Sequence, residues 1–461
     1  MEMPKTRIRW LLMPAEVKAR DFKSRLLISC EAASKGINVV FGSQDAVFSN
    51  LDKLPRGIYF EKSIAKNKYN VLKRRIDMGF RIVSLDEEGL CSVSNPIDYL
   101  KQRVSDCTIP LADRIFVWGK EEARIISEHF KGAEKSVVVA GNPRIDLLRP
   151  EFRDIFREKA ESYRKKYGRY ILLPSNFTVR HAHGHYFILK QAWRMGTITN
   201  KKEEKEYREM LADIDKAFAF HTKMIEQLAA EFPDRQIIIR PHPSEDKRQW
   251  DKVKKTSNNI RVIYSGSISP WLLGADLVIH NSCTTGLEAY LLGRPVIAYL
   301  PFANRDYEKH VSNHVSLQVR ELEELIAKAR DILDKQERFN ISKENTDELS
   351  RQVAFLSGQF SYEKIVDELL KLEWPDSRID GPLMRFTLGK RVIASGKTIT
   401  RMILIKMSLF RKKYLHTLQK FPYSTFREVR GTIDSLSMHM RDACKLDLAQ
   451  VGDNLYIIRK K

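Results

Sequence analysis

The chain has 461 residues, which is too long for one domain of ordinary size and long enough for two. Its formal net charge of +21 favours anionic partners such as phosphorylated substrates, acidic lipid headgroups or nucleic acid. No stretch reaches the ~20 apolar residues needed to cross a bilayer, so we expect a soluble or peripheral protein. The cysteines form no CxxC pair, which argues against a disulfide framework and a structural zinc site and favours a cytoplasmic setting: Cys30, Cys91, Cys107, Cys283 and Cys444.

Short β-branched runs alternate with helical patterns along the chain, which predicts parallel sheets with crossover helices. The predicted strands of the first half are RIRWLLM (7–13), INVVFG (37–42), GIYFEKS, RIVSLDEEG, RIFVWG and SVVVAG. Those of the second half are YILLPSN (170–176), QIIIRPHP (236–243), IRVIYSG (260–266), DLVIHNS (276–282) and PVIAYLP (295–301). The fold class expected from two such sets is α/β, with two Rossmann-like domains.

Composition sets the expected domain boundaries. Residues 1–150 and 151–375 form the two Rossmann-like domains, and 376–461 form a basic helical extension. Residues 381–461 hold 17 Lys and Arg against five Asp and Glu, more than half of the surplus charge of the chain. Within this extension, the segment 389–415 alternates Lys and Arg with Ile, Met, Leu and Phe. This composition is typical of a helix lying on an anionic membrane. An amphipathic helix packed on the protein itself would look the same.

The strongest chemical pattern lies at strand ends of the second half. Arg240, His242 and Pro243 leave a hydrophobic strand where a doubly wound sheet meets its ligand. After the strand 276–282, a small polar loop precedes a helix whose N-terminus would bind an anion. This loop supplies Ser282, Thr284, Thr285 and Gly286, and Glu288 follows, placed either to hold a ribose hydroxyl or to favour the helix dipole. A proline-held loop and an ordinary helix cap are the simpler interpretations of the two segments.

A second pattern follows the strand RIVSL in the first half. Adjacent carboxylates in a cleft cannot all ionise cheaply, so one of Asp86, Glu87 and Glu88 would have a raised pKa and serve as a base. An exposed acidic turn ended by Gly89 is the alternative.

These three motifs, in this order, resemble those of bacterial sialyltransferases and related Kdo-transferases, which have the GT-B fold and use CMP-activated acidic sugars. The matching segments are Glu87-Glu88-Gly89, His242-Pro243 and Ser282-Cys283-Thr284-Thr285. The resemblance implies two domains facing a central cleft and Glu88 as the base. It also implies that His242 and Arg240 hold the CMP phosphate and assist the leaving group, and that the Ser282–Thr285 loop completes the phosphate site.

The chain also resembles loosely characterised surface carbohydrate biosynthesis proteins of bacterial polysaccharide loci, in PAEVKARDF, GNPRIDLL and HNSCTTGLEAYLLGRPVIAYLP. We therefore expect transfer of a Kdo-like or nonulosonic acid to a surface polysaccharide, a lipopolysaccharide or a lipid-linked acceptor, at the inner membrane. Three further residues are weaker candidates for contact with donor sugar or acceptor: Asn176, Arg20 and Asn313.

The expected partners are a nucleotide-sugar donor, a glycan or lipid-linked acceptor and an anionic membrane surface, with no metal ion and no other cofactor. Nucleic acid is disfavoured because the chain has no helix-turn-helix, zinc-finger or RNP-like motif. Two other functions stay open. One is a CDP-glycerol glycerophosphotransferase or a UDP-sugar enzyme, including the 2-epimerases. The other is a non-catalytic basic assembly factor on the membrane.

Overall fold

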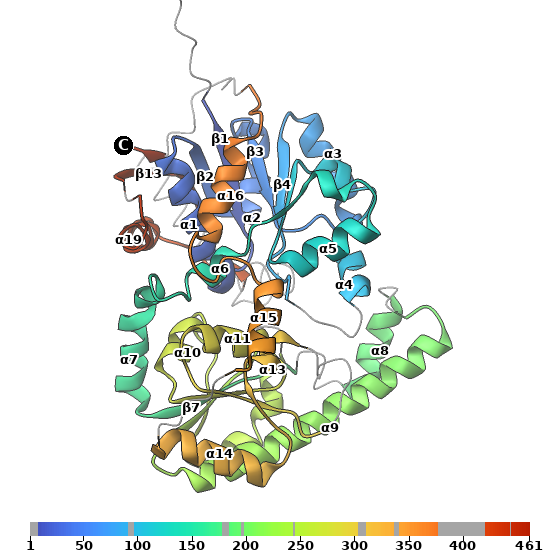
Figure 1. Cartoon of the computed structure of the whole chain (residues 1–461), viewed down its shortest axis with the longest axis vertical. Helices are drawn as coiled ribbons and strands as arrows, with labels where there is room; N and C mark the ends of the chain where they lie inside the picture. Colours follow the sequence, from blue (N-terminus) through green and yellow to red (C-terminus); the bar gives the residue numbers. More distant parts are fainter. Residues whose placement is uncertain are drawn as a thin grey trace, which may run out of the picture. The chain divides into compact units, whose positions relative to one another are not determined.

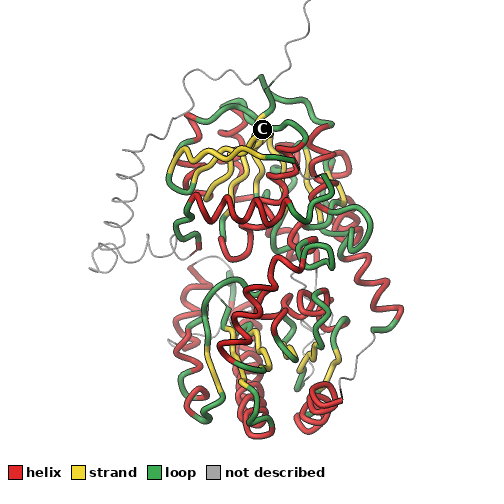
Figure 2. Tube along the Cα trace, turned by 90° about the vertical axis from the view of Figure 1, so that its left-hand side faces the viewer, coloured by secondary structure: helices red, strands yellow, loops and turns green. Residues whose placement is uncertain are grey.

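The computed structural model describes residues 8–90, 96–177, 184–194, 198–242, 245–302, 310–335, 341–376, 420–442 and 444–461. These residues form two compact units. Unit 1 contains the described residues up to Ile155 and again from Ser350 onward, and unit 2 contains the described residues from Phe156 to Leu349. In each unit the strands gather into one sheet and the helices pack beside it (Figure 2).

Unit 1 is built on an eight-stranded sheet of order β13-β14-β2-β1-β3-β4-β5-β6. Its strands are β1 (Trp10–Ala15), β2 (Asn38–Ser43), β3 (Ile58–Glu61), β4 (Arg81–Leu85), β5 (Arg114–Val117), β6 (Val137–Val139), β13 (Leu446–Gly452) and β14 (Leu455–Lys460). Strands β1 to β6 are parallel, and their order is that of a flavodoxin-like sheet with its switch point between β1 and β3. Strand β14 runs antiparallel to both β2 and β13.

The helices of unit 1 come from both ends of the chain (Figure 1). They are α1 (Lys18–Ser34), α2 (Gln44–Ser49), α3 (Tyr69–Asp77), α4 (Pro96–Arg103), α5 (Lys120–His129), α6 (Pro143–Asp146), α16 (Ser361–Leu370) and α19 (Phe426–Ser437). Helices α16 and α19 both pack against α1. The buried carboxylate of Asp146 accepts the backbone N–H groups of Ser361 (3.0 Å) and Tyr362 (2.9 Å), which fixes the start of α16.

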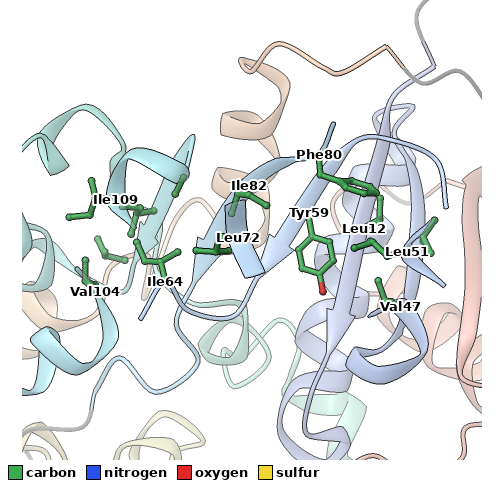
Figure 3. Packing of buried hydrophobic residues seen from close by; sticks show 14 of the residues in the cluster. Leu12, Val47, Leu51, Tyr59, Ile64, Leu72, Phe80, Ile82, Val104 and Ile109 are labelled. Carbon is green, nitrogen blue, oxygen red and sulfur yellow. The ribbon is translucent and has the colours of Figure 1, made fainter. Parts of the chain in front are cut away.

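Apolar side chains from the parallel strands fill the core of unit 1. Leu12, Tyr59 and Ile82 come from β1, β3 and β4 and lie in one layer with side chains of the neighbouring helices (Figure 3). Each is at most 1% exposed. Strands buried on both faces read as continuous β-branched runs, which is why the sequence shows them clearly.

Unit 2 is built on a six-stranded sheet of order β12-β11-β10-β7-β8-β9, with every described pairing parallel. Its strands are β7 (Tyr170–Pro174), β8 (Gln236–Arg240), β9 (Ile260–Val262), β10 (Leu277–His280), β11 (Val296–Tyr299) and β12 (Leu317–Val319). Its helices are α7 (Arg157–Tyr167), α8 (Gly184–Arg194), α9 (Lys201–Glu231), α10 (Ser269–Gly274), α11 (Thr284–Leu291), α13 (Val311–His314) and α14 (Leu322–Lys335). Within α15 (Lys343–Gln352) the chain returns to unit 1.

The predicted fold class, α/β with two Rossmann-like domains, is confirmed by these two sheets. The predicted boundary at residue 375 is wrong, because Ser350 and the residues after it belong to unit 1. The predicted extension 376–461 is also not a separate element. Its described part, from residue 420 on, supplies α19 and two strands of the sheet of unit 1.

The predicted membrane-binding segment 389–415 lies outside the described residues. Among the residues that are described, no helix has the length and apolar character needed to span a bilayer.

The C-terminal hairpin should stabilise unit 1. Ile458 in β14 is 0% exposed and pairs with Val39 of β2. We expect Ile458→Ala to lower the free energy of unfolding by about 2–5 kcal/mol, since it leaves a cavity in the core. Lys460→Ala, at the exposed end of the same strand, should change it by less than about 0.5 kcal/mol. Chemical denaturation measures both, and equal stability of the two variants would contradict this role of the hairpin.

Candidate functional site

The strand order of unit 2 places its switch point between β7 and β10. Read from the other edge the order is β9-β8-β7-β10-β11-β12, which is the 3-2-1-4-5-6 arrangement of a Rossmann sheet. Such sheets bind ligands beyond the carboxyl ends of the strands that flank the switch point. The half-buried Asn176 follows β7 there, and the loop Asn281–Thr285 follows β10.

The loop after β10 adopts an unusual backbone conformation at Ser282, whose φ of 55° lies in the left-handed region. The Ser282 side chain is buried, and its Oγ accepts a hydrogen bond from Nδ2 of Asn313 at 2.9 Å. Asn313 is 0% exposed and sits in α13. It was predicted as a sugar-contacting residue, and the structure places it behind the loop, where it holds Ser282.

His280, the last residue of β10, ties the loop to the protein interior. Its Nδ1 accepts the backbone N–H of Cys283 at 3.2 Å, so the ring proton is on Nε2, which faces Ser316 Oγ at 2.9 Å. Ser316 in turn donates to the carbonyl of Ser312 at 2.6 Å. Burial lowers the pKa of His280 to about 3, which keeps the ring neutral. A Cβ on Gly286 would overlap this ring, so the loop requires glycine there.

The predicted Ser/Thr segment therefore forms the start of α11. Cys283 is the N-cap residue, and Thr284 and Thr285 occupy the first turn, half-buried. The first four N–H groups of a helix have no partner within it and carry the positive end of the helix dipole. Glu288 is buried in the second turn, so the alternative in which it favours the dipole from the first turn is wrong.

Arg240 does not present its guanidinium as a phosphate ligand. Its N–H groups donate to the carbonyls of Ser265 (2.7 Å), Gly266 (2.9 Å) and Ile263 (3.3 Å), and the guanidinium lies over the ring of Trp271. Burial lowers its pKa to about 10. Arg240 thus holds the loop after β9. The predicted phosphate contact was inferred from residue type, strand-end position and the family resemblance, none of which shows what the side chain reaches.

A buried carboxylate that the sequence pattern did not single out joins two loops at the switch point. Glu245 follows β8 and accepts hydrogen bonds from Ser175 Oγ (2.8 Å), Phe177 N (2.8 Å) and Trp250 Nε1 (3.0 Å). It thereby fixes the loop after β7 against the loop after β8, on which His242 is exposed. Pro243 lies outside the described residues. The acidic residue directly after RPHPS was the available signal.

The acidic turn after β4 in unit 1 is held from several sides. Both carboxylate oxygens of Asp86 accept from Arg103 at 2.5 Å, and Asp86 Oδ1 also accepts the N–H of Glu88 at 2.9 Å. The indole of Trp118 donates to the Asp86 carbonyl at 2.7 Å and leaves no room for a Cβ at Gly89. The turn is therefore a structured element, in contrast to the simple exposed turn that was the alternative.

The two predicted catalytic glutamates differ in their surroundings. Glu87 is 4% exposed and pairs with the buried Arg25 at 2.8 Å; burial raises its pKa above the ordinary value. Glu88 is half-exposed and pairs with Arg20 at 2.8 Å and Arg103 at 3.3 Å. Burial would raise the pKa of Glu88, but the hydrogen bond from Arg20 and the nearby charges outweigh it and lower the pKa.

The switch point of unit 1 carries charged residues that the sequence reasoning missed. Glu16 follows β1 and pairs with Lys62, which follows β3, and with Lys420 at 2.8 Å. Arg20, predicted as a weak acceptor contact, has a nitrogen 3.9 Å from Glu16. Glu16, Lys62 and Lys420 are far apart in sequence, and Lys420 comes from the part of the chain that was predicted to be a separate basic extension.

No family model and no curated protein matches the chain. One similar solved structure is UDP-GlcNAc 2-epimerase from Methanocaldococcus jannaschii, with 13% identity, a TM-score of 0.47, and coverage of 79% of this chain and 99% of that chain. UDP-GlcNAc 2-epimerase from Neisseria meningitidis bound to UDP-GlcNAc has 12% identity, a TM-score of 0.46, and coverage of 78% and 98%. The wall teichoic acid polymerase TagF has 12% identity, a TM-score of 0.39, and coverage of 68% and 72%. At these values the function has to be argued from the residues of the chain.

Buried neutral histidines should make unit 2 sensitive to acid. Burial lowers the pKa of His221 and His310 to about 4 and that of His280 to about 3, from an ordinary 6.5. Below pH 6.5 the unfolded chain binds protons at these histidines that the folded unit does not bind. Their neutral form therefore costs the folded unit no stability above about pH 6.5. The stability of unit 2 should fall as pH drops toward 4, by about 1.4 kcal/mol per pH unit for each histidine.

Urea denaturation of the wild type and of His221→Leu at pH 7 and pH 5 measures this dependence. In the variant, the free energy of unfolding should fall less steeply between pH 7 and pH 5, by about the 1.4 kcal/mol per pH unit expected for one histidine. An unchanged slope would show that His221 is not neutral in the folded protein.

Proposed function

We propose that this protein is a nucleotide-sugar-dependent glycosyltransferase and that unit 2 binds the donor. The observation that carries the proposal is the loop Asn281–Thr285 at the Rossmann switch point, with its left-handed Ser282 at the start of α11. Hydrogen bonds from Asn313 and to His280 hold this loop in place. A site fixed in advance binds more tightly, because less conformational freedom is lost on binding.

The donor we propose is CMP-linked, carrying a Kdo-like or nonulosonic acid. The start of α11 offers neutral donors, namely the half-buried Thr284 hydroxyl and backbone N–H groups, and the exposed His242 lies on the loop after β8. Neutral donors match the single negative charge of a phosphodiester better than the two charges of a diphosphate. In this proposal Glu288 and Asn176 contribute to nucleotide and sugar binding, and Arg240 acts only by holding its loop.

The acceptor we propose is a bacterial surface polysaccharide or a lipid-linked glycan, with Glu88 as the base that takes the proton of the acceptor hydroxyl. Glu88 is the exposed glutamate of the acidic turn, and its lowered pKa keeps it ionised at neutral pH. Glu87 is buried and paired with Arg25, so we assign it a positioning role. Arg20 and Arg103 orient the Glu88 carboxylate.

Calorimetry with CMP, CDP and UDP tests the donor site. We expect the wild type to bind CMP most tightly and Thr284→Val to bind it about tenfold more weakly, because a hydrogen bond to a charged group is lost. Thr222→Val is the matched control, since that hydroxyl donates to Phe218 within α9. Tightest binding of UDP or CDP would replace the CMP donor by a UDP-sugar or CDP-glycerol. No binding of any nucleotide would favour a non-catalytic assembly factor and overturn the proposal.

Transfer kinetics with the donor so identified test the acidic turn. Glu88→Gln should lower kcat by about 10²–10⁴-fold, because the amide cannot accept the proton. Glu121→Gln, which alters a half-buried carboxylate on α5 paired with Arg124, should leave kcat unchanged. Circular dichroism checks that both variants fold. Full activity of Glu88→Gln would remove Glu88 from the catalytic assignment.

A further inference from the structure

Unit 1 holds a cavity of about 220 Å³ between α1 and α19 that has no place in the proposed reaction. Its polar and small lining residues are Lys23, Arg427, Glu428, Gly431, Thr432 and Ser435. Helix α19 lies beside α1 (Figure 1) and contributes one face to the cavity. The lining combines cations with hydroxyl groups, which is the set of groups that recognises a phosphate on a hydroxylated carbon skeleton.

Lys23 brings a half-buried positive charge to this cavity. Among the described residues no carboxylate lies within ion-pair distance of its ammonium, and the nearby Glu428 pairs with Lys18 at 2.7 Å. Burial lowers the pKa of Lys23, while the charge of Glu428 opposes that shift. A desolvated ammonium without a paired anion costs free energy, and a bound anion would offset the cost.

Gly431 keeps the cavity open. It lies inside α19, and a Cβ added there would meet nothing within 4 Å. An exposed glycine inside a helix costs about 0.5–1 kcal/mol relative to alanine, so stability does not account for it. The helix already has its N-cap, since Thr425 Oγ1 accepts the N–H of Glu428 at 3.1 Å. What Gly431 does provide is space on the face of α19 that lines the cavity.

The other groups fit the hydroxyls of a ligand. Thr432 Oγ1 donates to the Glu428 carbonyl at 2.8 Å, which leaves its lone pairs able to accept. Ser435, one turn further on, is half-buried and lines the same cavity. The volume lies below the ~300–1,000 Å³ of pockets for drug-sized ligands, so the occupant has only a few carbon atoms.

We propose that this cavity binds a small phosphate monoester of a polyol or sugar, with Lys23 and Arg427 on the phosphate and Glu428, Thr432 and Ser435 on its hydroxyls. The phosphate can belong to a soluble metabolite or to a lipid headgroup, which share this chemistry. The site is independent of the donor site in unit 2.

Calorimetry on the full chain tests the proposal with glycerol 3-phosphate, inorganic phosphate and glycerol as probes. Glycerol 3-phosphate should bind the wild type more tightly than phosphate does, and glycerol should not bind. Lys23→Met and Gly431→Leu should each weaken glycerol 3-phosphate binding at least tenfold, the first by removing the charge and the second by filling the space. Lys35→Met, which removes a lysine paired with Asp442 near the other end of α1, is the charge-matched control and should bind normally.

Folding is checked by thermal denaturation, in which Gly431→Leu should be at least as stable as the wild type because leucine is the better helix former.

Vesicles of phosphatidylcholine with and without phosphatidic acid distinguish a lipid headgroup from a soluble metabolite as the source of the phosphate. Vesicle binding that needs phosphatidic acid and is lost in both variants supports a lipid headgroup, and binding of glycerol 3-phosphate alone supports a soluble ligand. Failure of every phosphate probe to bind, or equal binding by Lys23→Met, overturns the proposal. Nucleotide binding should be unchanged in both variants, so the two sites can fail separately.

Discussion

The imidazole of His280 is the constraint on which the candidate donor site depends. It ends β10, is 1% exposed, and has both nitrogens engaged, one by the N–H of Cys283 and the other by Ser316. A buried ring with fixed partners transmits the rigidity of the sheet to the first residues of α11. The same ring occupies the space beside Gly286, so the close approach of helix and strand is possible only with glycine there.

The loops at the carboxyl ends of the strands are held by different interactions in the two units. In unit 2 the loops are held mainly by hydrogen bonds to buried side chains, with Asn313 holding Ser282 and Glu245 holding Ser175. In unit 1 the loops are held by ion pairs, such as those of Glu88 with Arg20 and Arg103. Both sets of interactions fix the positions of the loop side chains, and the proposed catalytic role requires such fixed geometry.

Sequence patterns predicted the parallel strands well because strands buried on both faces are continuous β-branched runs, as at 236–240 and 277–280. They missed the hairpin of β13 and β14, because the surplus of basic residues in 381–461 led to the prediction of a basic helical extension. The turn Asp453-Asn454, between alternating apolar and polar residues, was a usable signal, and Asn454 has a φ of 52°. Residue types located the loop at 282–285. They could not show that the guanidinium of Arg240 donates its hydrogen bonds to the backbone carbonyls of Ser265 and Gly266.

The remaining site features are long-range and leave no local pattern. Lys420 reaches Glu16 from a position 404 residues away, and the partner of Glu87 is Arg25 on another element. Such pairs depend on the sheet order, which periodicity does not determine.

Hydrogen–deuterium exchange with and without saturating CMP tests whether unit 2 holds the donor phosphate at its switch point, since it locates a bound phosphate by the amides that it protects. We expect slower exchange at residues 282–287 and 175–177, on the two sides of the switch point of unit 2. Protection confined to unit 1, or none at a CMP concentration that calorimetry shows to be saturating, would contradict this expectation.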